Sequence, residues 1–384
     1  MKTICSLDKC TGCYACVNAC PKQCISMQPI GRKYHLYPVV DESKCIDCNL
    51  CERVCQVNHP VELVPSLRAF AGWHKKIDEY HSCNSGGAAT AMSQNIIRQG
   101  GVVYGCSCLE GVDIKHVRIA REDNLYLLKG SKYVQSTIGN TYTEAQKDLK
   151  AGKKVLFIGT PCQIGGLKKY LHKDFNNLIT VDLICHGTPS LYSLRKHIEK
   201  VAKLEGSIVS FRKGNDFGLC VMNNSTTLYY CSLWRNRYRD AYFSTFIDGY
   251  TYRESCYTCK YACSQRVSDI TIGDFWGIGS DFNYDTINGC SCMLPNTSKG
   301  IELLQSSDLL LFERPIEEAI AGNDQLRHPV KKDFRKKLFD CLFPLMGIKK
   351  AYLLCELDHI WQQEYWSRIK NKIPKIRNYH PIHD

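Results

Sequence analysis

The chain has 384 residues, of which 44% are hydrophobic and 23% charged, and these proportions exclude a wholly disordered protein. The length favours two or three domains, the formal net charge is +12, and 24 residues are cysteine. The N-terminus shows no signal-peptide pattern, and no apolar run reaches the roughly 18 residues that a membrane-spanning helix needs. We therefore expect a reduced, cytoplasmic setting in which many thiols serve as ligands rather than as disulfides.

Residues 1–62 contain two copies of the spacing C-x2-C-x2-C-x3-C, which is typical of bacterial two-cluster ferredoxins. In such proteins three cysteines of each copy bind one 4Fe-4S cluster and the fourth binds the other cluster. The spacing thus predicts two ligand sets: Cys10, Cys13, Cys16 and Cys55 for one cluster, and Cys45, Cys48, Cys51 and Cys20 for the other. Gln56 replaces the proline of the first copy, Pro21, and we expect a looser turn there. Cys5 and Cys24 fall outside the pattern and are interpreted as packing residues.

A linker over residues 60–65 separates this α+β, ferredoxin-like segment from the rest of the chain. Beyond it, apolar runs alternate with helical patterns, which predicts an α/β body with a mostly parallel or mixed sheet. Ser85, Gly86 and Gly87 form a turn before a small-residue helix over 88–98, and GVVYGCS follows as a strand. Such a turn offers free amides to a phosphate, but it is more often only a helix start.

The next landmark is the stretch GSKY, which precedes a helix predicted over residues 142–149. Its Lys132, beside a glycine and Ser131, suits a phosphate or carboxylate group. A surface loop is an equally good interpretation.

Two strand-to-helix turns each carry a cysteine. In VLFIGTPCQ a buried strand over 155–158 ends shortly before Cys162, and in LICHGTPS a strand ends at Cys185. Ser190 is placed to cap the helix that follows, which we expect to end near Lys203. Open α/β sheets bind ligands at the carboxyl ends of their strands, and both cysteines lie at such an end. From the residues alone, Cys162 can be interpreted as a core residue, a reactive thiol or a metal ligand.

A third group of cysteines lies in RESCYTCKYAC, where Cys256 and Cys259 form C-x2-C and Cys263 follows four residues later. This spacing is shared by zinc half-sites, redox pairs and halves of iron-sulfur sites. Positive charge from Arg253, Lys260 and Arg266 would favour thiolates. DITIGDFWGIG then predicts a strand that leads into a glycine-rich turn.

The tail over residues 331–384 is basic, with 12 Lys or Arg against 6 Asp or Glu. If this tail is helical, one apolar face contains Leu353, Leu357, Ile360, Trp361 and Ile369. A basic amphipathic helix most often packs on its own domain, and contact with a membrane surface or a partner is the alternative. Nucleic-acid binding is not expected, because no recognised binding fold accompanies the charge.

Together these landmarks resemble the family of the coenzyme F-420-reducing hydrogenase beta subunit and its dehydrogenase relatives. The matching stretches are SGG, GSKYVQS, VLFIGTPCQIGGL, ICHGTPS and SDITIGDFWGI, and a two-cluster ferredoxin segment is a known fusion in this family. The resemblance implies an N-terminal-type region over 66–150 and a C-terminal-type region over 151–330. It also implies FAD, at least one further 4Fe-4S cluster, and ferredoxin or another redox protein as partner.

The resemblance also implies roles for individual residues. The FAD contacts carried over by position are Ser85, Gly86, Gly87, Ser131, Lys132, Tyr133, Thr160, Pro161 and Gln163. The ligands predicted for a third 4Fe-4S cluster are Cys162, Cys185, Cys256 and Cys259. A set in which Cys263 replaces one of them, and reactive or buried thiols, are the alternatives. His186 is interpreted as a proton donor near the flavin or as a structural residue of its turn.

The function predicted from this resemblance is that of an iron-sulfur flavoprotein oxidoreductase. It would pass electrons between ferredoxin-type clusters and FAD, and so reduce or oxidise a small-molecule substrate or coenzyme F-420. Many bacterial relatives belong to polysaccharide-synthesis settings. The alternative is a non-catalytic electron-transfer subunit of a larger complex.

Overall fold

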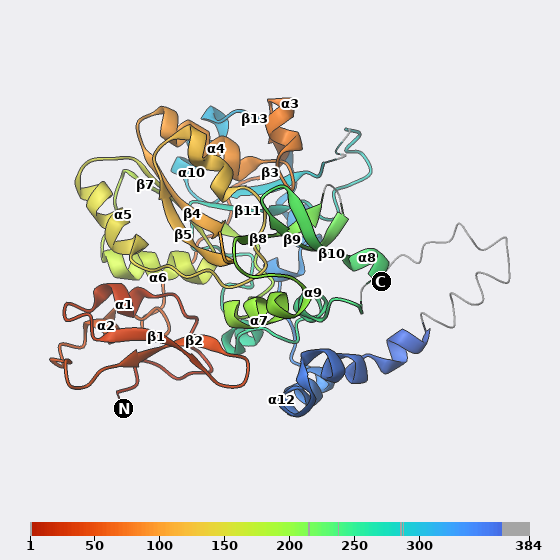
Figure 1. Ribbon diagram of the computed structural model, residues 1–384. Helices are drawn as coiled ribbons and strands as arrows, with labels where there is room; N and C mark the ends of the chain where they lie inside the picture. The colour runs from red at the N-terminus through yellow and green to blue at the C-terminus, as the bar shows by residue number, and fades with distance from the viewer. Residues whose placement is uncertain (1, 214–215, 237, 285, 287, 363–384) are drawn as a thin grey trace.

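The computed structural model describes residues 2–213, 216–236, 238–284, 286 and 288–362 (Figure 1). Its N-terminal domain is small and lies beneath the body of the molecule, with α1 directly below α6. The elements of this domain are α1 (Ala15–Ala19), β1 (Ile25–Ile30), β2 (His35–Val40) and α2 (Leu50–Arg53). Strands β1 and β2 form an antiparallel hairpin in which Ile25 pairs with Val40.

The body is built on a mixed sheet of eight strands in the order β13-β3-β12-β11-β7-β6-β4-β5. These strands are β3 (Ala69–His74), β4 (Val102–Leu109), β5 (Asp113–Ile119), β6 (Val155–Gly159), β7 (Leu178–Leu183), β11 (Ile270–Asp274), β12 (Ser291–Pro295) and β13 (Leu309–Arg314). The central strands β4, β6, β7 and β11 are parallel, and the remaining pairings are antiparallel. The predicted α/β body with a mixed sheet is confirmed.

Helices cover both faces of this sheet. Alternate strand residues point to opposite sides, so each face carries apolar side chains that a helix layer buries. Tyr104 and Phe157 pack against α5 (Thr141–Lys150) and α6 (Pro161–Leu171), together with Ala15 of the N-terminal domain. Leu156 packs on the other side against α4 (Ala88–Arg98) and α10 (Ser298–Ser306). The N-terminal domain thus shares a hydrophobic core with one face of the sheet.

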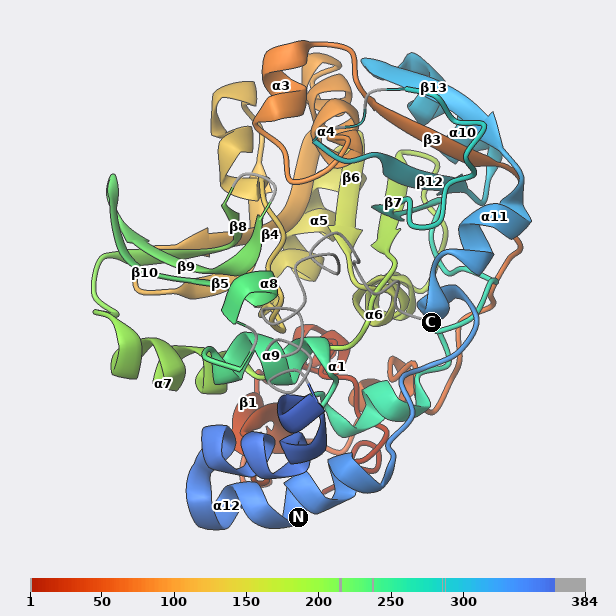
Figure 2. The ribbon, with the colours of Figure 1, turned by 90° about the vertical axis from the view of Figure 1, so that its right-hand side faces the viewer.

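A second, three-stranded antiparallel sheet has no counterpart in the sequence-based prediction (Figure 2). It consists of β8 (Ser207–Lys213), β9 (Asp216–Asn223) and β10 (Thr226–Ser232). It packs through a cluster rich in aromatic side chains against α7 (Leu191–Val201) and α9 (Ala241–Ile247). The remaining short elements are α3 (Ile77–His81), η1 (Glu122–Leu128), α8 (Leu233–Asn236), η2 (Glu254–Thr258), α11 (Ile316–Ala321) and η3 (Asp324–Leu326).

The tail contains α12 (Phe334–Cys355), which is interrupted by the non-helical backbone of Gly347. Phe339 and Tyr352 of this helix pack against Tyr250 of the body. Of the predicted apolar face, Leu357 and Trp361 are exposed, and Ile369 lies outside the described residues. None of the helices in the described part of the chain is long and apolar enough to cross a membrane.

Candidate iron-sulfur and cofactor sites

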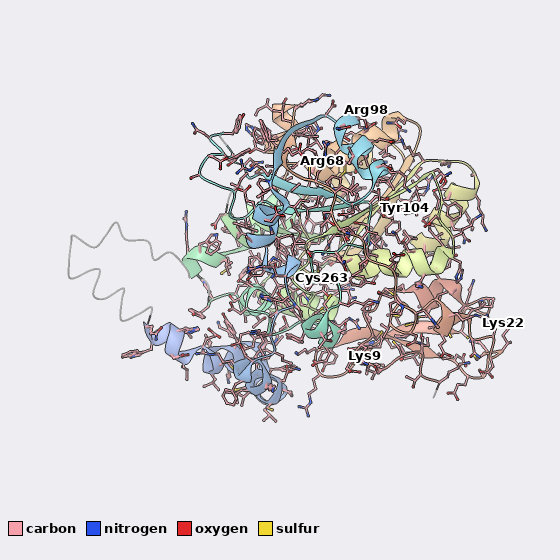
Figure 3. All side chains as sticks on the ribbon, turned by 180° about the vertical axis from the view of Figure 1, so that it is seen from behind. Lys9, Lys22, Arg68, Arg98, Tyr104 and Cys263 are labelled. Atoms are coloured by element: carbon pink, nitrogen blue, oxygen red, sulfur yellow. The ribbon has the colours of Figure 1, made fainter. Side chains whose placement is uncertain are left out.

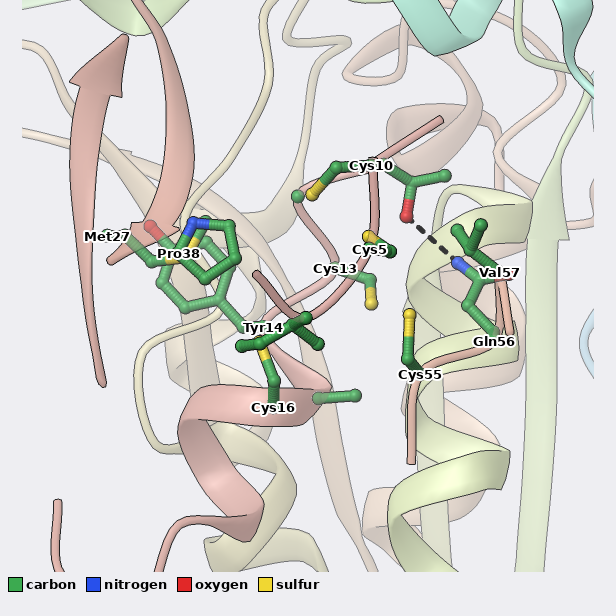
Figure 4. A pocket seen from close by; sticks show the side chains of 14 residues that line it. Cys5, Cys10, Cys13, Tyr14, Cys16, Met27, Pro38, Cys55, Gln56 and Val57 are labelled. Atoms are coloured by element: carbon green, nitrogen blue, oxygen red, sulfur yellow. Dashed lines mark hydrogen bonds between the residues drawn. The ribbon is translucent and has the colours of Figure 1, made fainter. Parts of the chain in front are cut away.

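Two hollows in the N-terminal domain gather the cysteines of the two motifs. The first N-terminal site is lined by Cys10, Cys13, Cys16 and Cys55 (Figure 4). The second N-terminal site is lined by Cys20, Cys45, Cys48 and Cys51. Each hollow therefore combines three cysteines of one motif with the fourth of the other, which is the ligand distribution that the spacing predicts. Four thiols around one hollow fit a 4Fe-4S cluster.

The two cysteine loops have the same backbone conformation. In the first loop Gly12 and Tyr14, on either side of Cys13, have positive φ angles of 64° and 65°. In the second loop Asp47 and Asn49, on either side of Cys48, have φ angles of 51° and 56°. Left-handed backbone is uncommon for residues other than glycine. Its recurrence at matching positions shows that the sequence repeat is also a conformational repeat.

Cys5 and Cys24 are more than packing residues, because each lines one of these hollows. Cys5 lies beside Cys55, and its hydrogen bond lowers the pKa of the Cys55 thiol to about 6. Cys24 Sγ lies 3.3 Å from Cys20 Sγ. The interpretation of these two cysteines as packing residues agrees with their place in a hydrophobic cluster with Ile4 and Val40, and the structure adds that they lie beside the motif cysteines.

A third hollow, here called the body site, is lined by Cys162, Cys185, Cys256 and Cys259. Cys162 lies in the first turn of α6, and Cys185 follows the end of β7. The other two come from η2 and the residue after it. The structure thus brings together the four cysteines predicted as ligands of a third cluster.

Cys263 does not belong to the lining of this hollow. Its Sγ instead lies 3.4 Å from the carbonyl oxygen of Lys260 and 3.3 Å from that of Gln265 (Figure 3). The geometry therefore favours the set with Cys259 over the alternative sets with Cys263.

Burial dominates the electrostatics of the body site. It raises the pKa of the Cys185 thiol to about 12 and that of Cys259 to about 11, and it raises the pKa of Cys162 well above its usual range. Each thiolate would also repel the other three. Such thiols ionise when a cation compensates their charge, and iron bound at this site would supply that charge. Among the described residues, no three His, Cys, Asp or Glu side chains lie close enough to bind a single metal ion.

The start of α6 fixes the position of Cys162. Pro161 occupies the first helical position, and Thr160 and Gln163 form a reciprocal capping box. Thr160 Oγ1 lies 3.3 Å from Cys162 Sγ, and Gln163 Nε2 donates to Ser136 Oγ at 3.0 Å. The local sequence Thr-Pro-Cys-Gln therefore holds the thiol at the mouth of the turn.

Arg266 holds the backbone of Tyr261, which lines the body site. Its guanidinium is 1% exposed, donates to Asp182 at 2.7 Å, and donates to the carbonyl oxygen of Tyr261 at 2.9 Å. Lys260 donates to the carbonyl oxygen of Gln56 at 2.6 Å. These cations thus have structural partners that the sequence did not indicate.

The Ser85-Gly86-Gly87 turn contains polar atoms with unused hydrogen-bonding capacity. Asn84 Nδ2 and Ser85 Oγ are buried and have no hydrogen-bond partner among the described residues. A Cβ atom on Gly130 would lie 3.6 Å from Asn84 Nδ2, so the GSKY loop runs beside this turn. Buried polar atoms normally have hydrogen-bond partners, so a buried polar atom without one indicates a place where a ligand could bind. The turn therefore fits a polar ligand such as the phosphate or ribityl part of FAD.

Residues 130–136 connect this turn to the body site. Ser131 and Lys132 lie at the end near Asn84, and Ser136 lines the body site. Lys132 Nζ donates to the carbonyl oxygens of Leu128 and Lys129 at 3.1 and 2.7 Å, so its ammonium is held locally.

The aromatic ring of Tyr133 stacks on Phe243 and Phe246. It belongs to the core under the second sheet, whereas Thr160, Pro161 and Gln163 line the body site. The predicted FAD contacts therefore lie in three places: the turn at Ser85 with the neighbouring loop, the core under the second sheet, and the body site.

His186 also lines the body site. Burial lowers its pKa, and the negative charges of Asp324 and Asp274 only partly offset this effect. The imidazole is therefore neutral at neutral pH and can both donate and accept a hydrogen bond.

A junction between the first N-terminal site and the body site escaped the sequence analysis. Thr11 lines both hollows, and Arg253, which is 1% exposed, donates to the carbonyl oxygen of Cys10 at 3.2 Å. Gln56 is fully buried there and donates to the carbonyl oxygen of Cys162 at 2.8 Å. The looser turn expected at Gln56 stays a prediction, whereas the side-chain amide of Gln56 is held by the body. The only signal in the sequence was the replacement of proline by a polar residue.

Comparison with known protein families gives matches to two separate parts of the chain. Residues 9–59 match a 4Fe-4S dicluster domain, and residues 152–316 match the family formed by the C terminus of the coenzyme F420 hydrogenase/dehydrogenase beta subunit. Residues 152–316 are therefore similar to the C terminus of coenzyme F420 hydrogenase/dehydrogenase beta subunits, and residues 9–59 are similar to 4Fe-4S dicluster domains.

Two individual proteins are also similar to parts of the chain. An uncharacterized protein from the rpl9-rpl11 intergenic region of Porphyra purpurea is 38% identical over 52 residues, which are 12% of this chain and 65% of that protein. The chain thus spans about two thirds of that relative. In the xenon-derivatised F420-reducing nickel-iron hydrogenase complex of Methanosarcina barkeri, one chain is 21% identical with a TM-score of 0.46. The similarity covers 69% of this chain and 87% of that one.

Proposed function

We propose that the protein is an iron-sulfur flavoprotein oxidoreductase that passes electrons from its N-terminal clusters through a third 4Fe-4S cluster to FAD. The observation that carries this proposal is the adjacency of the first N-terminal site and the body site, which share Thr11. Eight cysteines from two domains thus form neighbouring sites. Adjacent sites of this kind suit transfer of electrons in series.

The order of the sites supports entry of electrons at the N-terminal domain. Lys22 lines the second N-terminal site and lies at the outer edge of the molecule (Figure 3). The first N-terminal site faces the body through Thr11. Ferredoxin or another redox protein would therefore donate at the second site, and the body site would receive electrons last.

The flavin would be held by the segment that connects the Ser85-Gly86-Gly87 turn to the body site. Asn84 and Ser85 have the unused polar atoms, Ser131, Lys132 and the backbone of Tyr133 belong to the connecting segment, and Thr160, Pro161 and Gln163 line the body site at its other end. Bound FAD supplies the conversion between one-electron and two-electron chemistry. His186, which lines the body site, would hold a proton beside it. Coenzyme F-420 and small-molecule acceptors are the substrates to test, and a polysaccharide-synthesis setting stays a prediction.

The experiment that tests this proposal is an anaerobic count of iron, acid-labile sulfide and flavin per chain. About twelve iron and one FAD are expected for three cubane clusters and a flavin. Cys162→Ala should lower the iron content by about four, whereas Cys263→Ala serves as the control and should leave it unchanged. Equal iron content in wild type and Cys162→Ala would refute the third cluster.

The non-catalytic electron-transfer subunit is the competing function, and the two matched families are compatible with it. It predicts about eight iron without bound flavin, or flavin that small acceptors cannot reach. Reduction of a free acceptor by the purified chain with a reduced ferredoxin separates the two functions.

A further inference from the structure

The side chain of Gln56 joins the first N-terminal site to the body site. Gln56 directly follows Cys55 and is fully buried. Its Nε2 atom donates to Thr11 Oγ1 at 2.9 Å, marked by the dashed line in Figure 4, and to the carbonyl oxygen of Cys162 at 2.8 Å. Its Oε1 atom accepts a hydrogen bond from the hydroxyl of Tyr261. One amide therefore contacts both cysteine sites.

The chemistry of this position is specific for a primary amide. Both donors of the amide and its oxygen are used. A glutamate would place a carboxylate oxygen against the carbonyl oxygen of Cys162, and the proline of the first motif has no side-chain polar group. The position thus requires a hydrogen-bond donor toward Thr11 and Cys162 and an acceptor toward Tyr261.

The two domains also approach each other closely around Gln56. A Cβ atom on Gly165 of α6 would lie 3.0 Å from Gln56 Oε1 and would collide with the Tyr261 hydroxyl. The backbone of Gln56 is also held, because its carbonyl oxygen accepts from Lys260 Nζ at 2.6 Å. The amide therefore has little freedom to change its partners.

We propose that Gln56 is a positioning residue that sets the connection between the first N-terminal site and the body site. This inference rests on the proposed function. The connection runs from Cys55 through the Gln56 amide and its hydrogen bond to the backbone of Cys162. A single electron passes along it, and no bond is broken and no proton is transferred. Removal of the amide replaces the hydrogen bond by a van der Waals gap and frees the first turn of α6.

The test compares full-length wild type, Gln56→Met and Gln28→Met, all prepared anaerobically with their cofactors. Methionine keeps the length of the side chain but loses its hydrogen bonds. Gln28 is the matched control, since it is an exposed glutamine that contacts Ser26 at 3.1 Å. Three quantities are measured: iron per chain, magnetic coupling between reduced clusters by electron paramagnetic resonance, and hydrogen-deuterium exchange of the α6 first turn.

Gln56→Met is expected to keep the wild-type iron content and to lose part of the magnetic coupling. Exchange in the first turn of α6 should become about tenfold faster, which corresponds to the loss of one net hydrogen bond. Gln28→Met should match wild type in all three measurements. Identical coupling and exchange in the two variants would overturn the inference.

If Gln56→Met loses iron, a variant with a smaller structural change keeps the inference testable. Tyr261→Phe removes only the hydroxyl that donates to Gln56 and keeps the buried ring. It should change coupling and exchange in the same direction, and no change in either would also overturn the inference. If wild type itself holds about eight iron, the proposed function fails. The exchange measurement then still shows whether Gln56 holds α6.

Discussion

The carboxylate of Asp148 links helix α5 to strands β4 and β5 by hydrogen bonds. It lies on α5, and its oxygens accept hydrogen bonds from Tyr104 at 2.6 Å and from Arg118 at 2.6 and 3.0 Å. Lys153 donates to it at 3.0 Å. Burial alone would raise the pKa of this carboxyl, but these donors outweigh it and hold the pKa well below its usual range. The ionised form therefore stabilises the folded state.

This pKa shift predicts the sign of a pH effect on stability. Because the folded-state pKa lies below the unfolded value of about 3.9, the stabilisation is complete above that pH and is lost as the pH falls further. Asp148→Asn should lower the free energy of unfolding by about 1–3 kcal/mol at pH 7 and by less at acidic pH. Urea unfolding at pH 7 and at about pH 2.5, which is below the unfolded pKa, measures both values. Asp123→Asn, in the exposed pair with Arg121, is the control and should change stability by less than about 1 kcal/mol.

At the scale of elements, α6 shows why two glycines occur inside a helix. Gly165 faces Tyr261 and Gln56, and a Cβ atom on Gly166 would lie 2.9 Å from both Cβ and Sγ of Cys13. The two glycines let the N-terminal domain approach the helix backbone closely. This contact places a thiol of the first N-terminal site against the helix that carries Cys162.

Gly166→Ala should therefore reduce iron content and thermal stability. Helix propensity alone would favour alanine by about 1 kcal/mol, so a loss of stability must come from displacement of Cys13. Iron per chain and the unfolding temperature are measured against Lys168→Ala, a change on the partly exposed side of the same helix. A Gly166→Ala protein with full iron content and a higher unfolding temperature would contradict the steric argument.

The elements that carry motifs were predictable because their signals are local. The helix predicted over 88–98 is α4, the strand over 155–158 lies within β6, and Ser190 caps α7 by accepting from the Ser193 amide. The helix expected to continue to Lys203 ends at Val201. The second sheet was missed, since its strands follow one another as hairpins without a motif. Its fold depends on aromatic packing between distant residues such as Phe211 and Phe243.

At the scale of the whole molecule, the cysteine sites were predictable as groups but not in their arrangement. Spacing and resemblance were enough to select the four cysteines that line the body site. The contact between the domains was not accessible in this way. It is made by single polar side chains, Gln56 and Arg253, whose partners lie more than a hundred residues away. Nothing in their local sequence indicates which backbone carbonyls they will reach.

Arg253 forms a polar link between the two domains. It donates to the carbonyl oxygens of Cys10 and Leu36 at 3.2 and 2.6 Å and to Gln135 at 3.0 Å. Its guanidinium also lies 4.5 Å from the centre of the Tyr37 ring. A buried guanidinium that satisfies two backbone carbonyls of another domain couples the unfolding of the two domains.

Arg253→Met should uncouple the domains. We expect a loss of about 3–5 kcal/mol, because the carbonyl groups that accept from Arg253 remain buried without donors. Calorimetry should then show the N-terminal domain unfolding before the body, and limited proteolysis should cut the linker at residues 60–65 more rapidly. Arg68→Met, which removes an exposed pair with Glu313 at 3.7 Å, should cost no more than about 1 kcal/mol and leave a single transition. A single, unshifted transition in Arg253→Met would show instead that the shared hydrophobic core around Tyr14 and Ile164 holds the domains together without the guanidinium.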